Sequence, residues 1–349
     1  MAAYLPKCLD SLVNQTFKDI DIVTVNNGSA DDTLAILRKY AATDSRIKVI
    51  DTENSGLPQA RNLGLDSSDS EYVMFCDADD WYSPQMCQIM HEAVSRSGAD
   101  VACCQTFLED APDLGTDEKR IRHDEGYYRP KMSGKYRLTD KLILKTNVMV
   151  WNKIWRRDLL KKHGVRFPEI RTHEDDCFWY MYAVHAKTVF YVKERLYHYL
   201  LRPSSIMSMM TDKNNPLRKT RLEVAKVVMD YVMQGHSAAR DVKKLILDIF
   251  LDETQKTVPF LSETELLESC EDINRTVERN LKVPCRFVPL CGSVTNLYSG
   301  LTCAGLLWQK FQLKTHYCVN RLTGRKISER LTFKLAENDA RLKFIKSLR

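Results

Sequence analysis

Hydrophobic positions in the first hundred residues alternate between helical and strand spacing. Leu5, Cys8, Leu9, Leu12 and Val13 recur at helical intervals, which predicts a helix at the start of the chain. Short apolar or β-branched runs follow, separated by turn residues and by further helical patterns. The predicted strands are 20–25, 47–50, 72–76 and 101–107, and the predicted helices between them are 34–40, 58–65 and 84–97. Ser83 is the predicted N-cap of the last of these helices, with Pro84 as its first residue. This alternation predicts an α/β fold with a mostly parallel sheet flanked by helices.

The first predicted element is a helix, with only residues 1–4 ahead of it. A parallel sheet built from strand–helix units normally begins with a strand. The pattern therefore predicts a sheet that lacks its opening strand.

After residue 107 the pattern of the sequence changes, first to a loop and later to a helical region. Residues 109–134 are charged and contain Gly and Pro, which predicts a surface loop. A helix at 139–146 opens a second α/β portion that ends near residue 201. Beyond Pro216 the pattern is helical, with predicted helices at 217–233, 242–257 and 263–281. We therefore expect one α/β domain at 1–214 and a helical C-terminal region at 215–349.

Composition narrows the class of protein. The chain has 349 residues with 44% hydrophobic and 28% charged residues, as in globular proteins. Its 11 cysteines are irregularly spaced and form no C-x-x-C pair, which favours reduced thiols in a cytoplasmic protein. The longest apolar stretch, 301–308, is shorter than the ~20 residues that span a bilayer. An integral membrane protein is therefore not expected.

Positive charge is concentrated at the C-terminus. Residues 309–349 contain eleven Lys and Arg against three acidic residues, a net +8, so the total of +6 leaves −2 for the rest. A basic segment with interspersed apolar residues is typical of contact with an anionic membrane surface. The alternative is a solvated face of ordinary helices. Nucleic acid is not an expected partner, because the segment contains no known recognition motif.

Three acidic residues follow the predicted strand 72–76. Asp77, Asp79 and Asp80 lie where ligands bind to parallel sheets, beyond the carboxyl ends of the strands. Carboxylates are hard oxygen ligands that suit Mg²⁺ or Mn²⁺, and these ions also bind phosphate oxygens. A solvated turn that caps the next helix is the structural alternative.

Other polar groups follow the predicted turns. Asn26–Ser29 ends a strand and could approach a base or a ribose closely. Arg61 lies on a helix that begins at a loop and could face a phosphate, although the motif alone favours a surface position. Glu174–Asp176 begins an apolar run, where carboxylates are favoured by the helix dipole or could act as a base.

The order of these motifs resembles the family-2 glycosyltransferases, bacterial enzymes of surface-polysaccharide assembly with the GT-A fold. The resemblance covers roughly residues 4–206 and leaves out the helical C-terminal third. It rests on Tyr4–Leu12, Gln15–Phe17, Asn26–Ser29 with Asp31 and Asp32, Asn54–Gly64, Asp77–Trp81, Trp151–Arg157, Glu174–Phe178 and Arg202–Ile206.

The resemblance implies an inverting transfer of a sugar from a nucleoside-diphosphate donor, with UDP as the default nucleotide. Asp175 would be the general base, and Asp79 would ligate Mn²⁺ or Mg²⁺ on the diphosphate. Asp77 would hold the donor's ribose or sugar. Asn27 and Arg61 would flank the base. His198 would complete the metal shell, or else be a structural histidine.

The same resemblance implies a saccharide or lipid-linked saccharide acceptor and a cytoplasmic protein, peripheral to the inner membrane. Two departures stand out: the family usually has Asp where this chain has Asn27, and the family's opening strand is absent. They leave two alternatives open. One is a truncated, non-catalytic scaffold with the same fold, and the other is a nucleotidyltransferase.

Overall fold

The computed structural model describes residues 1–111, 132–202, 220–235, 242–257, 263–281, 287–290 and 293–296. It divides into two compact units, one formed by 1–215 with 230–242 and the other by 216–229 with 243–349. Most of the predicted loop at 109–134, the apolar stretch 301–308 and the basic segment 309–349 lie outside the described residues.

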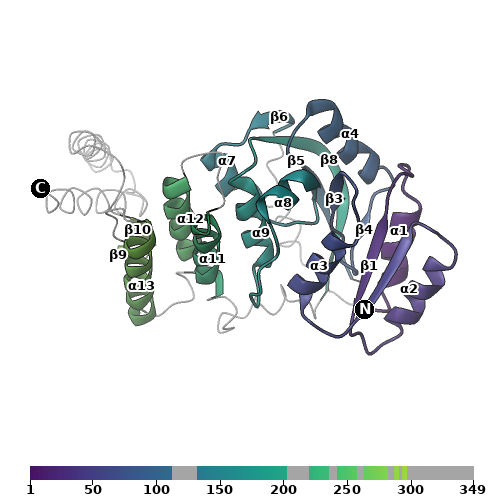
Figure 1. The fold of residues 1–349 in the computed structure, drawn as a ribbon, viewed down its shortest axis with the longest axis horizontal. Coiled ribbons are helices and arrows are strands. Elements are labelled where there is room, and N and C mark those ends of the chain that lie inside the picture. Colours follow the sequence, from purple (N-terminus) through teal and green to yellow (C-terminus); the bar gives the residue numbers. More distant parts are fainter. Residues whose placement is uncertain are drawn as a thin grey trace, which may run out of the picture. The chain divides into compact units, whose positions relative to one another are not determined.

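The first unit alternates strands and helices along the chain (Figure 1). In chain order its elements are α1 (Leu5–Val13), β1 (Ile22–Asn27), α2 (Thr33–Ala41), β2 (Ile47–Thr52), α3 (Leu57–Asp66), β3 (Tyr72–Met74), β4 (Trp81–Tyr82), α4 (Met86–Ser97), β5 (Val101–Asp110), β6 (Gly134–Arg137), α7 (Asp140–Lys145), β7 (Lys153–Arg156), α8 (Arg157–His163), α9 (Glu174–Ala183) and β8 (Thr188–Leu201).

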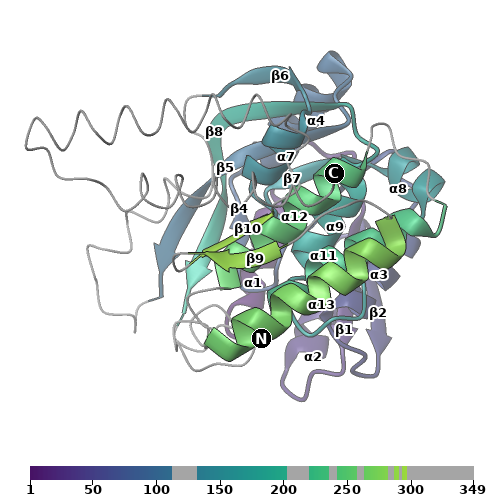
Figure 2. The same cartoon turned by 90° about the vertical axis from the view of Figure 1, so that its left-hand side faces the viewer.

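The strands form two separate sheets. Strands β1 and β2 pair in parallel, while a six-stranded sheet has the order β3-β7-β5-β8-β4, with β6 also paired to β8. The α/β class is confirmed, but the sheet is mixed rather than mostly parallel. Among the paired strands that the structure describes in the six-stranded sheet, β5 and β8 are the one parallel pair, and they lie side by side over most of their length (Figure 2). The hydrophobic alternation could not show this, because β7 comes from a later segment and inserts antiparallel between β3 and β5.

Strands β1 and β3 are both edge strands. β1 pairs only with β2, and β3 ends the order of the larger sheet, so in the described part of the chain no strand lies between them.

The turn before α4 differs from the sequence expectation. Ser83 and Pro84 were predicted to cap a helix, but the helix begins at Met86 after Gln85. Ser83 instead donates its N–H to Leu196 O at 2.8 Å, and the preceding residues form β4 against β8. Pairing with a strand more than a hundred residues away therefore overrides the local capping signal.

The second unit is mainly helical in its described part. Two predicted helices, 242–257 and 263–281, are confirmed as α12 (Val242–Thr257) and α13 (Glu263–Leu281). The predicted helix 217–233 begins at Arg221 as α11 (Arg221–Met233). A short antiparallel pair, β9 (Phe287–Leu290) and β10 (Ser293–Asn296), was not expected. In the described ranges no helix is long and apolar enough to cross a bilayer.

Candidate active site

Three carboxylates from two distant parts of the chain meet at one guanidinium. Arg61, on α3, lies 2.9 Å from Asp77 and 2.9 Å from Glu174, and its Nη1 lies 2.5 Å from Asp175. Asp77 follows β3, whereas Glu174 and Asp175 open α9. The sequence named Asp77, Asp175 and Arg61 as candidates, and the fold brings all three into direct contact.

Burial gives this cluster its electrostatic character. The Arg61 side chain is 9% exposed and that of Asp175 is 16% exposed. Burial disfavours the charged form of Arg61, but the carboxylates of Asp175, Asp77 and Glu174 hold its pKa well above the usual range. Burial also raises the pKa of Asp175 to about 7, although Arg61 opposes the shift. A carboxyl group with this pKa can exchange protons near neutral pH.

The helix that carries Asp175 is fixed by its surroundings. Every side chain from Asp176 to Ala183 is buried, so α9 is packed on all sides. Trp155 meets Phe178 edge-on with centroids 5.1 Å apart. At the start of the helix, Val150 donates its N–H to Asp175 Oδ2 at 3.3 Å. The base candidate is therefore held by a rigid part of the core rather than by a loop.

Asp80 is buried and hydrogen-bonded to protein groups, as a residue with a structural role would be. It is 1% exposed, and its two oxygens accept from Tyr197 OH at 2.6 Å and from Leu200 N–H at 2.8 Å. The same Tyr197 hydroxyl accepts from Asp77 N–H at 3.2 Å. Burial, with the charge of Asp77 nearby, raises the pKa of Asp80 to about 8. Asp80 thus anchors the turn that presents Asp77 and Asp79. The buried Tyr197 had no sequence signal.

Asp79 has a cationic partner at the end of β8. Arg202 Nε lies 2.6 Å from Asp79 Oδ2, and the two side chains are 19% and 17% exposed. Sequence reasoning listed Arg202 only as part of a motif, because nothing local relates it to a residue 123 positions away. The arrangement places a cation directly beside the carboxylate expected to face a diphosphate.

His198 is surrounded by protein groups. Its Nδ1 lies 2.7 Å from Glu109 Oε1 and its Nε2 lies 3.0 Å from Ser83 Oγ. Its ring stacks between Trp81 and Phe107, which lie opposite it on the neighbouring strands β4 and β5. Both ring nitrogens are therefore engaged, which favours a structural histidine over a metal ligand.

Asn27 lies in a second polar group at the end of β1. Its Oδ1 accepts from Ser55 N–H at 2.9 Å, and its Nδ2 lies 3.4 Å from Asn54 Oδ1. Gly28 permits this approach: it has φ +68°, and a Cβ there would stand 2.7 Å from Asn54 N. Arg61 was expected to flank the base together with Asn27, and in the structure its guanidinium donates to the carboxylates of the cluster described above.

The Trp151–Arg157 motif forms part of the core rather than an open site. Lys153 is fully buried, and its ammonium donates to Met149 O at 2.5 Å and to Asn152 Oδ1 at 2.9 Å. Burial lowers the pKa of Lys153. Trp151 stacks on Tyr197 with centroids 4.3 Å apart. The motif thus supports the residues that hold Asp77 and Asp175.

The site fits a divalent cation only if a bound substrate supplies some of the oxygen atoms that coordinate it. In the residues that the structure covers, no three His, Cys, Asp or Glu side chains gather as a metal cage. Mg²⁺ is commonly held by one or two carboxylates together with substrate phosphates. Asp79 suits that arrangement, because it offers a hard, partly exposed oxygen ligand. His198 does not, since both of its nitrogens are occupied.

Part of the chain matches a known protein family. Residues 2–164 match the model of glycosyl transferase family 2. This part of the chain is a family-2 glycosyltransferase domain. Its relatives include EpsH of Bacillus subtilis, named as a glycosyltransferase and 35% identical over 212 residues, or 58% of this chain and 59% of EpsH. Glycosyltransferase GlyA of Streptococcus pneumoniae is 30% identical over 60% of this chain and 30% of GlyA.

Solved structures share the fold of the glycosyltransferase domain. S. aureus TarS 1–349 in complex with UDP-GlcNAc matches with a TM-score of 0.60 and 20% identity, over 79% of each chain. The expected GT-A class is thereby confirmed. The chain spans 59% of EpsH and 30% of GlyA, so their activities are not transferred to it directly.

Proposed function

We propose that this protein is a metal-dependent glycosyltransferase that moves a sugar from a nucleoside-diphosphate donor, with UDP as the nucleotide, to an acceptor hydroxyl with inversion. One observation carries the proposal. The carboxylates of Asp77 and Asp175 lie on opposite arms of the Arg61 guanidinium, and Asp79 follows Asp77 in the same turn. The proposed donor-binding group and the proposed base are thus side by side on one guanidinium.

The donor would lie along the carboxyl ends of β1 and β3. Asp77 is the proposed partner of the ribose or sugar, and Asn27 with Asn54 the partner of the base. Arg61 acts as the group that holds Asp77 and Asp175 in place. The UDP-GlcNAc in the S. aureus TarS structure supports UDP as the first nucleotide to test.

Asp175 is the proposed general base. A single displacement needs a group that accepts the proton of the acceptor hydroxyl as this oxygen attacks the sugar carbon. The raised pKa of Asp175 makes it a stronger base than an ordinary carboxylate, and Val150 N–H with Arg61 fixes its orientation. A Mn²⁺ or Mg²⁺ ion held by Asp79 would neutralise charge on the departing diphosphate.

A saccharide or lipid-linked saccharide is the proposed acceptor, at the cytoplasmic face of a membrane. The support is the net +8 charge of residues 309–349, within the proposed helical region 215–349. Removing 309–349 is expected to weaken binding to vesicles that contain anionic lipid, measured by co-sedimentation at low and physiological salt. Neutral vesicles are the control. Equal binding of both proteins to anionic vesicles would contradict a membrane role for the segment.

The donor site is tested by calorimetric titration with UDP. The unaltered chain is expected to bind UDP at least about tenfold more tightly with Mn²⁺ than with a chelator. Asp79→Ala should lose this metal dependence, although its metal-free affinity can rise because Arg202 is released. Asp110→Ala, which removes an exposed carboxylate at the end of β5, is the matched control and should behave like the unaltered chain.

The other possible outcomes identify the alternatives. If the unaltered chain binds no UDP, UDP-sugar or other nucleotide, the proposal is wrong and a non-catalytic scaffold is favoured. If incubation with a nucleoside triphosphate and a sugar phosphate releases pyrophosphate, the protein is a nucleotidyltransferase.

A further inference from the structure

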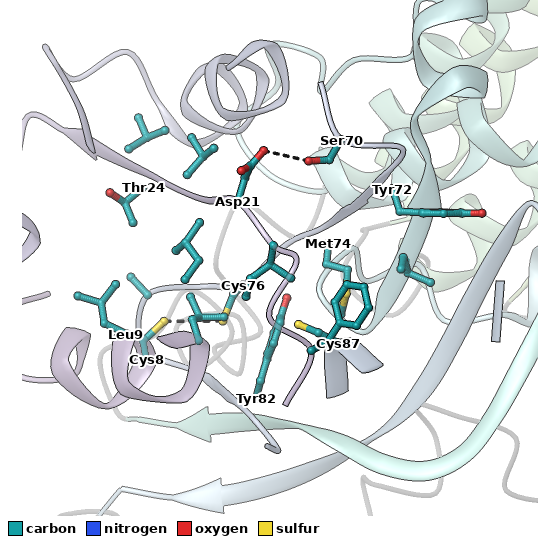
Figure 3. Close-up of a pocket in the computed structure, with 18 of the residues that line it drawn as sticks. Cys8, Leu9, Asp21, Thr24, Ser70, Tyr72, Met74, Cys76, Tyr82 and Cys87 are labelled. Atoms are coloured by element: carbon teal, nitrogen blue, oxygen red, sulfur yellow. Dashed lines mark hydrogen bonds between the residues drawn. The ribbon is translucent and has the colours of Figure 1, made fainter. Parts of the chain in front are cut away.

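Lys153 is a basic side chain in the core of the first unit. It lies on β7 and is fully buried. Side chains alternate across a strand, so the next residue, Ile154, is directed to the other face of the sheet, where it lines a cavity of about 490 Å³ together with Tyr72 and Met74 (Figure 3). Lys153 is directed towards α9 instead, with its Nζ 5.4 Å from the ring centroid of Trp179. Burying a charge is costly unless other groups compensate it, so its contacts are informative.

The ammonium of Lys153 holds one peptide group of the loop before β7. It donates to Met149 O at 2.5 Å and to Asn152 Oδ1 at 2.9 Å. Met149 O belongs to the peptide bond between Met149 and Val150, and the N–H of that same bond donates to Asp175 Oδ2 at 3.3 Å. One peptide group therefore connects the ammonium to the carboxylate of the proposed base, with a hydrogen bond at each end.

This arrangement stabilises the ionised form of Asp175 in two ways. Hydrogen bonds in series polarise one another, so an ammonium at the carbonyl end of a peptide group makes its N–H a stronger donor. Lys153 is also a positive charge within electrostatic reach of Asp175, in a part of the core where charges are screened less than in water. Both effects favour the carboxylate, which is the form that accepts a proton.

The other charged groups around Asp175 come from three elements. Burial disfavours its ionised form most strongly; Arg61 of α3 opposes that effect, and the charges of Glu174 on α9 and of Asp77 after β3 add to it. Arg61 donates to Oδ1, whereas the peptide group held by Lys153 donates to Oδ2. Each oxygen of the carboxylate is therefore held by a different cation, one directly and one through the peptide group.

Two thiols face Lys153 from β5. Burial raises the pKa of Cys103 to about 11 and raises that of Cys104 as well, so both stay neutral near pH 7. Burial lowers the pKa of Lys153, and the charge of Asp175 opposes that shift. Asp175 is thus the carboxylate that acts on Lys153, although within the described residues the two side chains form no direct ion pair.

We propose that Lys153 is a positioning residue for the base: through the peptide group between Met149 and Val150 it orients the Asp175 carboxylate and keeps it ionised near neutral pH. The inference rests on the proposed function only for the role of Asp175 as the base. The coupling between Lys153 and Asp175 is a property of the free protein, so it can be measured without donor, acceptor or metal.

The titration of Asp175 in the free protein is the first test. Carbon-13 NMR of the aspartate carboxyl groups follows it, and the signal of Asp175 is identified by its absence in Asp175→Asn. Lys153→Met replaces the ammonium by an apolar chain of similar length and is expected to raise the titration midpoint of Asp175 by about one pH unit, a tenfold change in its acid dissociation constant. Lys161→Met, at a lysine of α8 whose side chain is 60% exposed, is the matched control and should leave the midpoint unchanged.

Sugar transfer measured from pH 5 to 9 gives a second readout. Because less Asp175 is ionised at pH 7, kcat of Lys153→Met should be about fivefold lower there and should approach that of the unaltered protein at pH 9. Affinity for UDP should stay within about twofold, since the contacts of Lys153 are with the loop before β7. In the Asp175→Asn background Lys153→Met should not change kcat further, because Lys153 acts through Asp175.

The contrary outcomes are distinct. An unchanged titration midpoint in Lys153→Met would overturn the proposal, and so would a loss of kcat of equal size at every pH, which is the result of a purely structural role. If Lys153→Met does not fold, Lys153→Gln, which is neutral but can form hydrogen bonds, is measured in its place with the same expected shift. If the midpoint rises while the unaltered chain transfers no sugar, the coupling of Lys153 to Asp175 is supported and the proposed function is wrong.

Discussion

Replacing Asp175 by Asn is expected to lower kcat for sugar transfer by about 10²–10⁴-fold, because the variant keeps the shape of the side chain but cannot accept a proton. The position of the group should be preserved. An Asn oxygen can still accept from Val150 N–H, and α9 is held by its buried faces. Donor affinity, measured by titration with UDP, should therefore change much less than kcat.

The pH dependence supplies a second readout for Asp175. Burial raises the pKa of this carboxyl group to about 7, and only its ionised form accepts a proton. In the unaltered protein kcat is therefore expected to rise with pH up to about 7 and to level off above it. In Asp175→Asn the residual rate should lose this step. A profile measured from pH 5 to 9 at saturating donor and acceptor checks both statements.

Glu174→Gln is the matched control for Asp175→Asn. It removes one negative charge from the same Arg61 cluster, one residue away, without removing the proposed base. It is expected to keep kcat within about tenfold of the unaltered protein. If Glu174→Gln loses as much activity as Asp175→Asn, or if Asp175→Asn retains most of its activity, Asp175 is not the base.

Arg61→Ala is expected to lower the free energy of unfolding by about 3–5 kcal/mol, because it leaves buried carboxylates without their cation. Asp175, Asp77 and Glu174 would then repel one another in a site where the guanidinium is only 9% exposed. Losing Arg61 also removes a group that lowers the pKa of Asp175, so the step in the pH profile should move to higher pH. Urea unfolding at pH 7.5 measures the first effect.

Two further variants separate the ion cluster from simple loss of packing. Arg61→Lys keeps a charge but cannot contact several carboxylates with a planar fork, so it should be intermediate in stability. Arg61→Ala combined with Asp175→Asn should be more stable than Arg61→Ala alone, because one uncompensated charge is gone. An Arg61→Ala protein that loses less than about 1 kcal/mol would show that water, rather than Arg61, compensates these carboxylates.

Long helices were predictable from the sequence, because the regular spacing of their hydrophobic residues is visible within the segment itself. The helices at 242–257 and 263–281 are found at the predicted bounds. The two-residue strand β4 was not predictable, since its residues carry too little pattern. Trp81 and Tyr82 form a strand only because β8 pairs with them, and the expected cap at Ser83 is lost for the same reason.

The same distinction holds for the residues of the candidate site. The sequence showed where carboxylates with a possible function stand: Asp77 and Asp79 follow a predicted strand, and Asp175 lies at the start of a predicted apolar run. The residues that form ion pairs and hydrogen bonds with these carboxylates could not be predicted, because they are distant in the chain. Arg61 was expected beside the base, and the structure places it among carboxylates. His198 was a candidate metal ligand, and the structure shows both of its nitrogens bound to protein.

By itself the sequence determined the α/β class, the helical character beyond residue 216 and the family likeness, because periodicity and motif order are properties of the linear chain. Only the tertiary structure decided which charges neutralise one another and which strand edges stay open. Those outcomes depend on Arg61 meeting carboxylates up to 114 positions away and on β7 inserting beside β3. Ion pairing and strand pairing are long-range contacts, and no local pattern specifies the partner.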